Sequence, residues 1–217
     1  MIVCEGVNTE PIYLESLTRA LGLATTVDVE IHGAPGGTDP ETLVNFAVRR
    51  CAERAREVRR DITKAAYEEV WVVLDTEGRD HARAAALPGA LHKALARGVK
   101  VAVSRPCFEV WYILHDRATP PGLSVCDDAR PVLKKLLGAA HDKSRSDALR
   151  MVAWALPRTA VALEHGGRQA CFTAEARGHA ASMPSFTGTG VHRLVTELVA
   201  MSSDLLARRR LGFFEAD

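Results

Sequence analysis

The chain has 217 residues and a formal net charge of +1, which excludes a strongly basic protein that binds nucleic acid over its whole surface. A phosphate-binding surface must therefore be a local patch. Hydrophobic residues make up 47% of the sequence and charged residues 25%, a balance typical of globular proteins with a full core. No segment resembles a membrane span or a signal peptide, so we expect no membrane contact.

The cysteines are odd in number and show no CxxC spacing, which argues against a disulfide framework and against a zinc ribbon. We therefore expect buried, reduced thiols and a cytoplasmic protein. The five residues are Cys4, Cys51, Cys107, Cys126 and Cys171.

The first apolar segment, residues 1–4, predicts a short strand that ends at an acid, Glu5. Asn8 or Thr9 suits the N-cap of the helix that follows, with Glu10 in its first turn. Residues 27–31 then alternate between apolar and polar side chains, which indicates a half-buried strand at the edge of a sheet.

A long helix is predicted from Pro40 to about Lys64. One side is apolar, whereas the other carries more arginine than acid. Such a face is either solvated or binds phosphate groups. For phosphate contact we select Arg49, Arg56 and Arg60, since guanidinium groups suit phosphate recognition.

The most apolar strand of the sequence is predicted at residues 69–74, directly before Asp75 and Glu77. An unbroken apolar run is typical of a central parallel strand that is covered on both faces. Ligands of open α/β sheets bind at the carboxyl ends of such strands, and residues two apart face the same side. The two carboxylates can therefore share one cation, or they belong to an ordinary polar loop.

The remaining pattern predicts a helix over 81–97, a strand over 99–104 and a helix over 105–115. Strands and helices that alternate at short intervals indicate an α/β fold, with a mostly parallel sheet flanked by helices. The turn-forming residues 119–122 divide the chain into an α/β core, 1–118, and a mainly helical C-terminal part packed on it, 119–217. In the second part we expect helices over 127–137, 144–163 and 191–210, and a loop over 174–190.

Several motifs together resemble the RloB family. In chain order they are Cys4-Glu5-Gly6 with Thr9-Glu10-Pro11, Asp75-x-Glu77, Ser104-x-Pro106-Cys107-Phe108-Glu109-x-Trp111, Pro184-Ser185 and Val191-His192-x-Leu194-Val195. The Cys-Phe-Glu-x-Trp segment is the most specific of them, and the order covers nearly the whole chain. Members of that family look like Toprim-type proteins, whose carboxylates hold divalent metal for phosphodiester chemistry.

This resemblance implies that Glu5, Asp75 and Glu77 are catalytic residues and ligands of Mg²⁺ or Mn²⁺. Glu77 departs from the Toprim pattern, which has aspartate there. Its extra methylene shifts a bound cation, and octahedral Mg²⁺ tolerates such a shift poorly. Glu5 either binds the metal or acts as a general base.

Three further residues are candidates for the same site. Glu10 and Glu109 either join the metal ligands or only favour the start of their helices. Lys143 lies near a lysine that the family often shows. It either neutralises charge in the transition state, as a catalytic residue, or is an ordinary surface lysine.

The acids at the strand ends favour a metal-dependent nuclease acting on RNA or DNA, and the resemblance implies a role in anti-phage defence. The resemblance implies an ATPase of the ABC/AAA type, encoded nearby, as a partner. The main alternative is a catalytically degenerate binding module that regulates this ATPase or is regulated by it. A phosphotransfer receiver domain fits less well, because no second acid adjoins Glu5. The 191–210 helix also leaves a homodimer open.

Overall fold

The computed structural model describes residues 1–23, 29–34, 36–78, 82–169 and 187–213. Within these ranges the chain forms one five-stranded sheet in the order β2-β1-β3-β4-β5. Four strands are parallel, and β5 pairs with β4 in the antiparallel direction. The strands are β1 (Ile2–Cys4), β2 (Ile31–Gly33), β3 (Trp71–Asp75), β4 (Lys100–Arg105) and β5 (Gly188–Thr189). The predicted α/β class, with a mostly parallel sheet, is confirmed.

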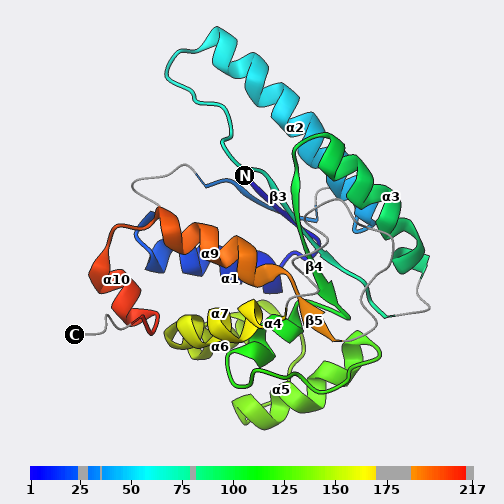
Figure 1. Cartoon of the computed structure of the whole chain (residues 1–217), viewed down its shortest axis with the longest axis vertical. Helices are drawn as coiled ribbons and strands as arrows, with labels where there is room; N and C mark the ends of the chain where they lie inside the picture. The colour runs from blue at the N-terminus through cyan, green and yellow to red at the C-terminus, as the bar shows by residue number, and fades with distance from the viewer. Residues whose placement is uncertain (24–28, 35, 79–81, 170–186, 214–217) are drawn as a thin grey trace.

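Helices cover both faces of the sheet (Figure 1). One face packs against α2 (Pro40–Arg60) and α3 (Ala82–Ala96). The other packs against α1 (Thr9–Ala20), α4 (Glu109–Leu114) and helices of the C-terminal part. The remaining helical segments are η2 (Cys126–Asp128), α5 (Ala129–Leu137), α6 (Arg145–Ala155), η3 (Leu156–Arg158), α7 (Thr159–Gly167), α9 (Val191–Met201) and α10 (Leu205–Arg210).

The strand β3 lies between β1 and β4, and all five of its residues are buried. Trp71 and Val73 face the α1 side, whereas Val72 and Leu74 face the α2 side. Both faces of the strand are thus apolar, which explains its unbroken hydrophobic run.

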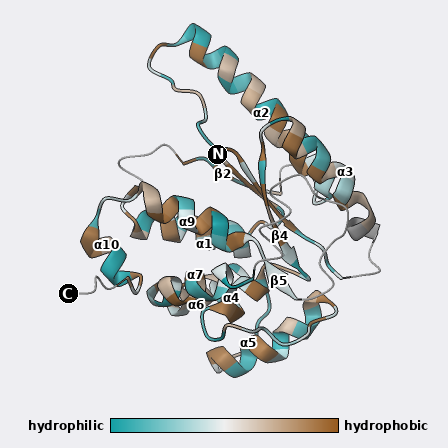
Figure 2. Ribbon diagram, in the orientation of Figure 1, coloured by the Kyte–Doolittle hydropathy of each residue, from teal (hydrophilic) through white to brown (hydrophobic). Residues whose placement is uncertain are grey.

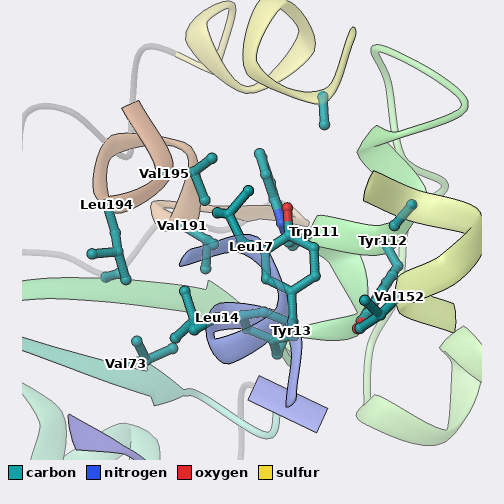
Figure 3. Packing of buried hydrophobic residues seen from close by; sticks show 14 of the residues in the cluster. Tyr13, Leu14, Leu17, Val73, Trp111, Tyr112, Val152, Val191, Leu194 and Val195 are labelled. Carbon is teal, nitrogen blue, oxygen red and sulfur yellow. The ribbon is translucent and has the colours of Figure 1, made fainter. Parts of the chain in front are cut away.

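The largest core contains an aromatic cluster between α1 and α4 (Figure 3). Tyr13 of α1 contacts the rings of Phe108, Trp111 and Tyr112 edge-on, at centroid distances of 5.6–6.2 Å. All six residues of α4 are buried, and Glu109 is the one charged residue among them. This cluster fixes α4, whose first residue is Glu109, against the first helix of the chain.

The C-terminal part shares this core, since Val152 of α6 and Val191 of α9 belong to the same cluster. It also contributes β5 to the sheet, where a loop was expected over 174–190. That expectation is wrong for residues 188–189, and residues 170–186 lie outside the described ranges. The division of the chain near residue 118 stays a prediction. Among the described residues, no helix has the length and apolar surface that crossing a bilayer requires.

Several predicted helices are shorter or broken. The expected 144–163 helix is divided by η3, because Pro157 lacks the N–H that a continuous helix needs. The expected 191–210 helix is interrupted before Asp204, which caps α10 by accepting a bond from the Ala207 N–H at 3.0 Å. The helix α2 ends at Arg60 rather than near Lys64. The edge strand that was predicted over 27–31 is observed over Ile31–Gly33, at the edge of the sheet, and residues 27–28 lie outside the described ranges.

Candidate metal centre

The sheet has a topological switch point between β1 and β3. The chain leaves β1 through α1 on one face to reach β2, and it leaves β3 through α3 on the other face to reach β4. The two connecting helices therefore diverge, which opens a crevice at the carboxyl ends of these strands. Glu5 directly follows β1, and Asp75 is the last residue of β3. The fold thus brings both acids to this crevice.

Three carboxylates form the centre of the site. Glu5, Asp75 and Glu77 each offer an oxygen atom, and these oxygens lie within 4.8 Å of one another. The Asp75 backbone N–H donates to Glu5 Oε2 at 2.9 Å, which orients the Glu5 side chain. Asp75 Oδ1 is buried and has no hydrogen-bond partner. An unpartnered buried oxygen in a carboxylate cluster suits a hard divalent cation.

A cavity of about 290 Å³ adjoins this cluster. All six residues that the sequence analysis assigned to the metal site line this cavity. They come from the ends of β1 and β3, the first turns of α1 and α4, and the loop before α6. They are Glu5, Glu10, Asp75, Glu77, Glu109 and Lys143. Arg49, Arg56 and Arg60 lie elsewhere, on α2.

Glu77 has a backbone φ of +60°, in the left-handed region that glutamate rarely adopts. Its N–H donates to the Pro106 carbonyl at 2.8 Å, which ties this turn to the segment after β4. Gly78 follows with a φ of +128°, and a Cβ there would meet the Ser124 carbonyl oxygen at 2.8 Å. The Glu77 carboxylate is therefore held by a constrained turn.

Burial makes the acids of the cavity expensive to ionise. It raises the pKa of Asp75 well above its usual value, and the charges of Glu10 and Glu109 act in the same direction. Burial also raises the pKa of Glu10 to about 7. The Glu10 carboxylate accepts a hydrogen bond from the Gly6 N–H at 3.1 Å. A bound cation would relieve this excess of negative charge.

Glu109 behaves differently, because cations compensate it. Burial alone would raise its pKa, but the hydrogen bond from His141 and the charge of Lys143 lower it to about 2. His141 Nε2 lies 3.0 Å from Glu109 Oε1, and Lys143 Nζ lies 3.3 Å from the same oxygen. Metal binding by Glu10 and Glu109, like that by Glu5, Asp75 and Glu77, stays a prediction.

Two residues of the site were not selected from the sequence, His141 and Asp147. Asp147 contacts His141 Nδ1 and Arg150, and it accepts hydrogen bonds from the backbone N–H groups of Asp142 and Lys143. It therefore shapes the loop that presents Lys143, which itself has a φ of +60°. The sequence shows only a helix start here, since the Ser144 hydroxyl caps α6 at the Asp147 N–H.

A larger cavity, of about 420 Å³, lies near the amino ends of β1 and β3. Its walls include Trp71 and two leucines of α9, Leu194 and Leu198. No group of three metal-ligating side chains gathers there among the described residues. The smaller, acidic cavity is thus the better candidate site.

Fold and site together define an α/β protein with a carboxylate cluster at the switch point of its sheet. Residues 1–198 match the family model of RloB-like proteins, so the chain belongs to the RloB-like family. This confirms the resemblance suggested by the motifs, and the match includes every residue of the cavity. Comparison with curated proteins and with solved structures gives no match.

The first prediction concerns the buried charge of Glu10. Native protein holds the Glu10 proton up to pH about 7, whereas an ordinary glutamate releases it near 4.5. Metal-free protein should therefore lose stability as pH rises between these values, and Glu10→Gln should prevent this loss. At pH 8 the free energy of unfolding of Glu10→Gln should exceed that of wild type by about 1–3 kcal/mol, as measured by urea titration. Equal pH dependence of both proteins would contradict the prediction; Glu15→Gln, on the exposed side of α1, is the control.

The second prediction concerns the cation that joins two buried carboxylates. His141→Gln leaves Glu109 and Asp147 without their shared partner, so the free energy of unfolding should fall by about 3 kcal/mol. Glu109 contributes stability above its ordinary pKa of 4.5 and loses it as pH falls towards about 2. Without His141 this loss should begin at higher pH. The exposed His92→Gln serves as control, and equal stability of both variants would show that His141 is not needed.

Proposed function

We propose that the chain is a divalent-metal-dependent phosphodiesterase that cleaves nucleic acid, using Mg²⁺ or Mn²⁺. The observation that carries this proposal is the convergence of Glu5, Asp75 and Glu77, with an unpartnered buried oxygen on Asp75. A divalent cation there would supply charge neutralisation at the attacking and leaving oxygens and would acidify a bound water. The family resemblance supports a role in anti-phage defence beside a partner ATPase.

The other residues of the cavity suit the remaining tasks of phosphodiester cleavage. The Lys143 ammonium group, held beside Glu109, would attract the anionic oxygens of a phosphodiester. Glu10 has a pKa of about 7, which matches a group that exchanges protons near neutral pH. The permanently ionised Glu109 is instead suited to holding Lys143.

A basic surface on α2 would extend substrate contact beyond the cavity. Arg49, Arg56 and Arg60 are exposed, whereas Arg50 and Arg54 are paired with Glu30 and Glu57. At 1.5 Å per residue, the 21 residues of α2 span about 31 Å. The helix starts near Thr38, at the acidic cavity, and its other end extends beyond the sheet, where Figure 2 shows mainly polar residues. A substrate that contacts both ends therefore needs about nine base pairs.

The third prediction tests the metal centre. Asp75→Asn should abolish cleavage that depends on Mg²⁺ or Mn²⁺, and it should keep the fold because it removes one of several repelling charges. Glu77→Asp should favour Mg²⁺ over Mn²⁺, since the shorter side chain allows a tighter octahedron and aspartate tolerates positive φ better.

Plasmid DNA, single-stranded DNA and total tRNA should be incubated with each variant and metal, with EDTA as blank. Calorimetry measures the binding of each ion, and bound metal should raise the Tm of wild type but not of Asp75→Asn. Asp127→Asn, in an exposed position, is the matched control. If wild type binds neither ion at millimolar concentration, the enzyme proposal fails. The alternative, a binding module that works with the ATPase, would then be favoured.

The fourth prediction concerns the arginines of α2. Changing Arg49, Arg56 and Arg60 together to Glu should weaken binding of a 20-base-pair duplex and flatten its salt dependence, because fewer counterions are released. Cleavage of a dinucleotide should not change, since a dinucleotide bound in the cavity is too short to reach the three arginines, the nearest of which lies nine residues into α2. The control reverses the charges of Arg130, Lys134 and Lys135 on α5, which alters net charge equally. If duplex binding depends on salt concentration equally in both triple variants, the arginines of α2 form a solvated surface rather than a binding surface.

A further inference from the structure

A pair of cysteines lies behind the acidic cavity. Cys107 precedes α4, and Cys126 begins η2. Both sulfur atoms and a carboxylate oxygen of Glu109 lie within 4.8 Å of one another. Both cysteines are free thiols. We propose that Cys107 and Cys126 are a peroxide-sensitive dithiol, and that their disulfide regulates the acidic site. The regulatory half rests on the proposed function, whereas formation of the disulfide does not.

The surroundings of Cys126 make it the sulfur that reacts first. Lys143 Nζ lies 3.1 Å from Cys126 Sγ, and a neighbouring ammonium group promotes the reactivity of a thiol. Cys126 is 8% exposed and Cys107 is fully buried, so an oxidant reaches Cys126 more readily. Cys107 Sγ lies within 4.8 Å of Cys126 Sγ, close enough to act as the resolving thiol.

The reaction needs one molecule of hydrogen peroxide. Cys126 sulfur attacks a peroxide oxygen, the O–O bond breaks, and a sulfenic acid and water form. Cys107 sulfur then attacks Cys126 sulfur, the S–S bond forms, and the S–O bond breaks with loss of a second water. Two thiols are thereby oxidised by two electrons in total, and the peroxide is reduced to two waters that take up both thiol protons.

Closing the pair would change both walls of the cavity. A disulfide brings two sulfurs to about 2 Å, and we expect the segment before Cys126 to follow its sulfur toward Cys107. Val125, the neighbour of Cys126, pairs with Gly78, which directly follows Glu77 and has no room for a Cβ. The shift would therefore move the turn that holds Glu77. At the same time, Cys126 would lose its contact with Lys143.

A zinc ion fits this group less well than a disulfide. The carboxylate of Glu109 already accepts from His141, and the Lys143 ammonium group contacts both Glu109 and Cys126. A zinc ion among these atoms would be repelled by the positive charges of His141 and Lys143. His141 and Lys143 thus already supply the positive charge that a metal would otherwise bring to the two sulfurs and the carboxylate.

The full chain should be treated with hydrogen peroxide, alkylated with N-ethylmaleimide and digested for mass spectrometry. We expect a linked peptide pair containing Cys107 and Cys126, and its absence from both Cys107→Ser and Cys126→Ser. Cys51 is an internal comparison, because it is more exposed than Cys126, whereas the contact of a sulfur with a lysine ammonium group is made by Cys126. Oxidation of Cys51 before Cys126, stoichiometric zinc in the purified protein, or a fully alkylated pair would each overturn the proposal.

Regulation is tested on the same samples. The disulfide form should lose nucleic-acid cleavage and regain it with dithiothreitol, whereas Cys51→Ser should respond to peroxide as wild type does. A disulfide form that cleaves at the full rate of the reduced protein would overturn the regulatory half alone. If reduced wild type shows no cleavage, the proposed function fails, but the peptide map still decides whether the pair forms.

Discussion

Buried negative charge is the constraint on which the site depends. Five carboxyl groups line one cavity, and within the described part of the chain Lys143 and His141 both contact one of them, Glu109. Desolvated carboxylates repel one another strongly, so each must be protonated, paired or bound to metal. The raised pKa values of Glu10 and Asp75 show which groups lack compensation. The fold therefore stores an electrostatic cost that a divalent cation can remove.

The cavity consequently has two halves with different electrostatic properties. Around Glu109, the chain supplies its own cations, and the network continues through His141 to Asp147 and Arg150. Around Asp75, no side-chain cation is within bonding distance among the described residues, and one carboxylate oxygen has no partner. The first half is built to be rigid and permanently charged. The second half lacks such compensation, so it is the part of the cavity where the proposed metal ion would bind, supported by the charged network of the first half.

The sequence predicted those parts of the site that follow from strand order. An apolar strand ending in Asp75, and a short strand ending at Glu5, are enough to place both acids at one edge of a parallel sheet. It could not predict that His141 and Asp147 meet Glu109, because α5 and the loop before α6 separate them and no residue pattern encodes that approach. The two-residue strand β5 was likewise missed, since Gly188 and Thr189 carry no strand signal before they pair with β4.

The two cysteines are brought together only by the fold. In the sequence, Cys107 and Cys126 are isolated residues that suggest no more than buried thiols. The aromatic core fixes α4 and thereby Cys107, while Asp128 accepts hydrogen bonds from the N–H groups of Ser124 and Val125 and holds Cys126. Two segments that are rigid for unrelated reasons thus present their sulfurs to each other. One of these segments also pairs with the turn of Glu77, because Val125 bridges Gly78, and this bridge is the backbone route that the proposed regulation of the acidic site would use.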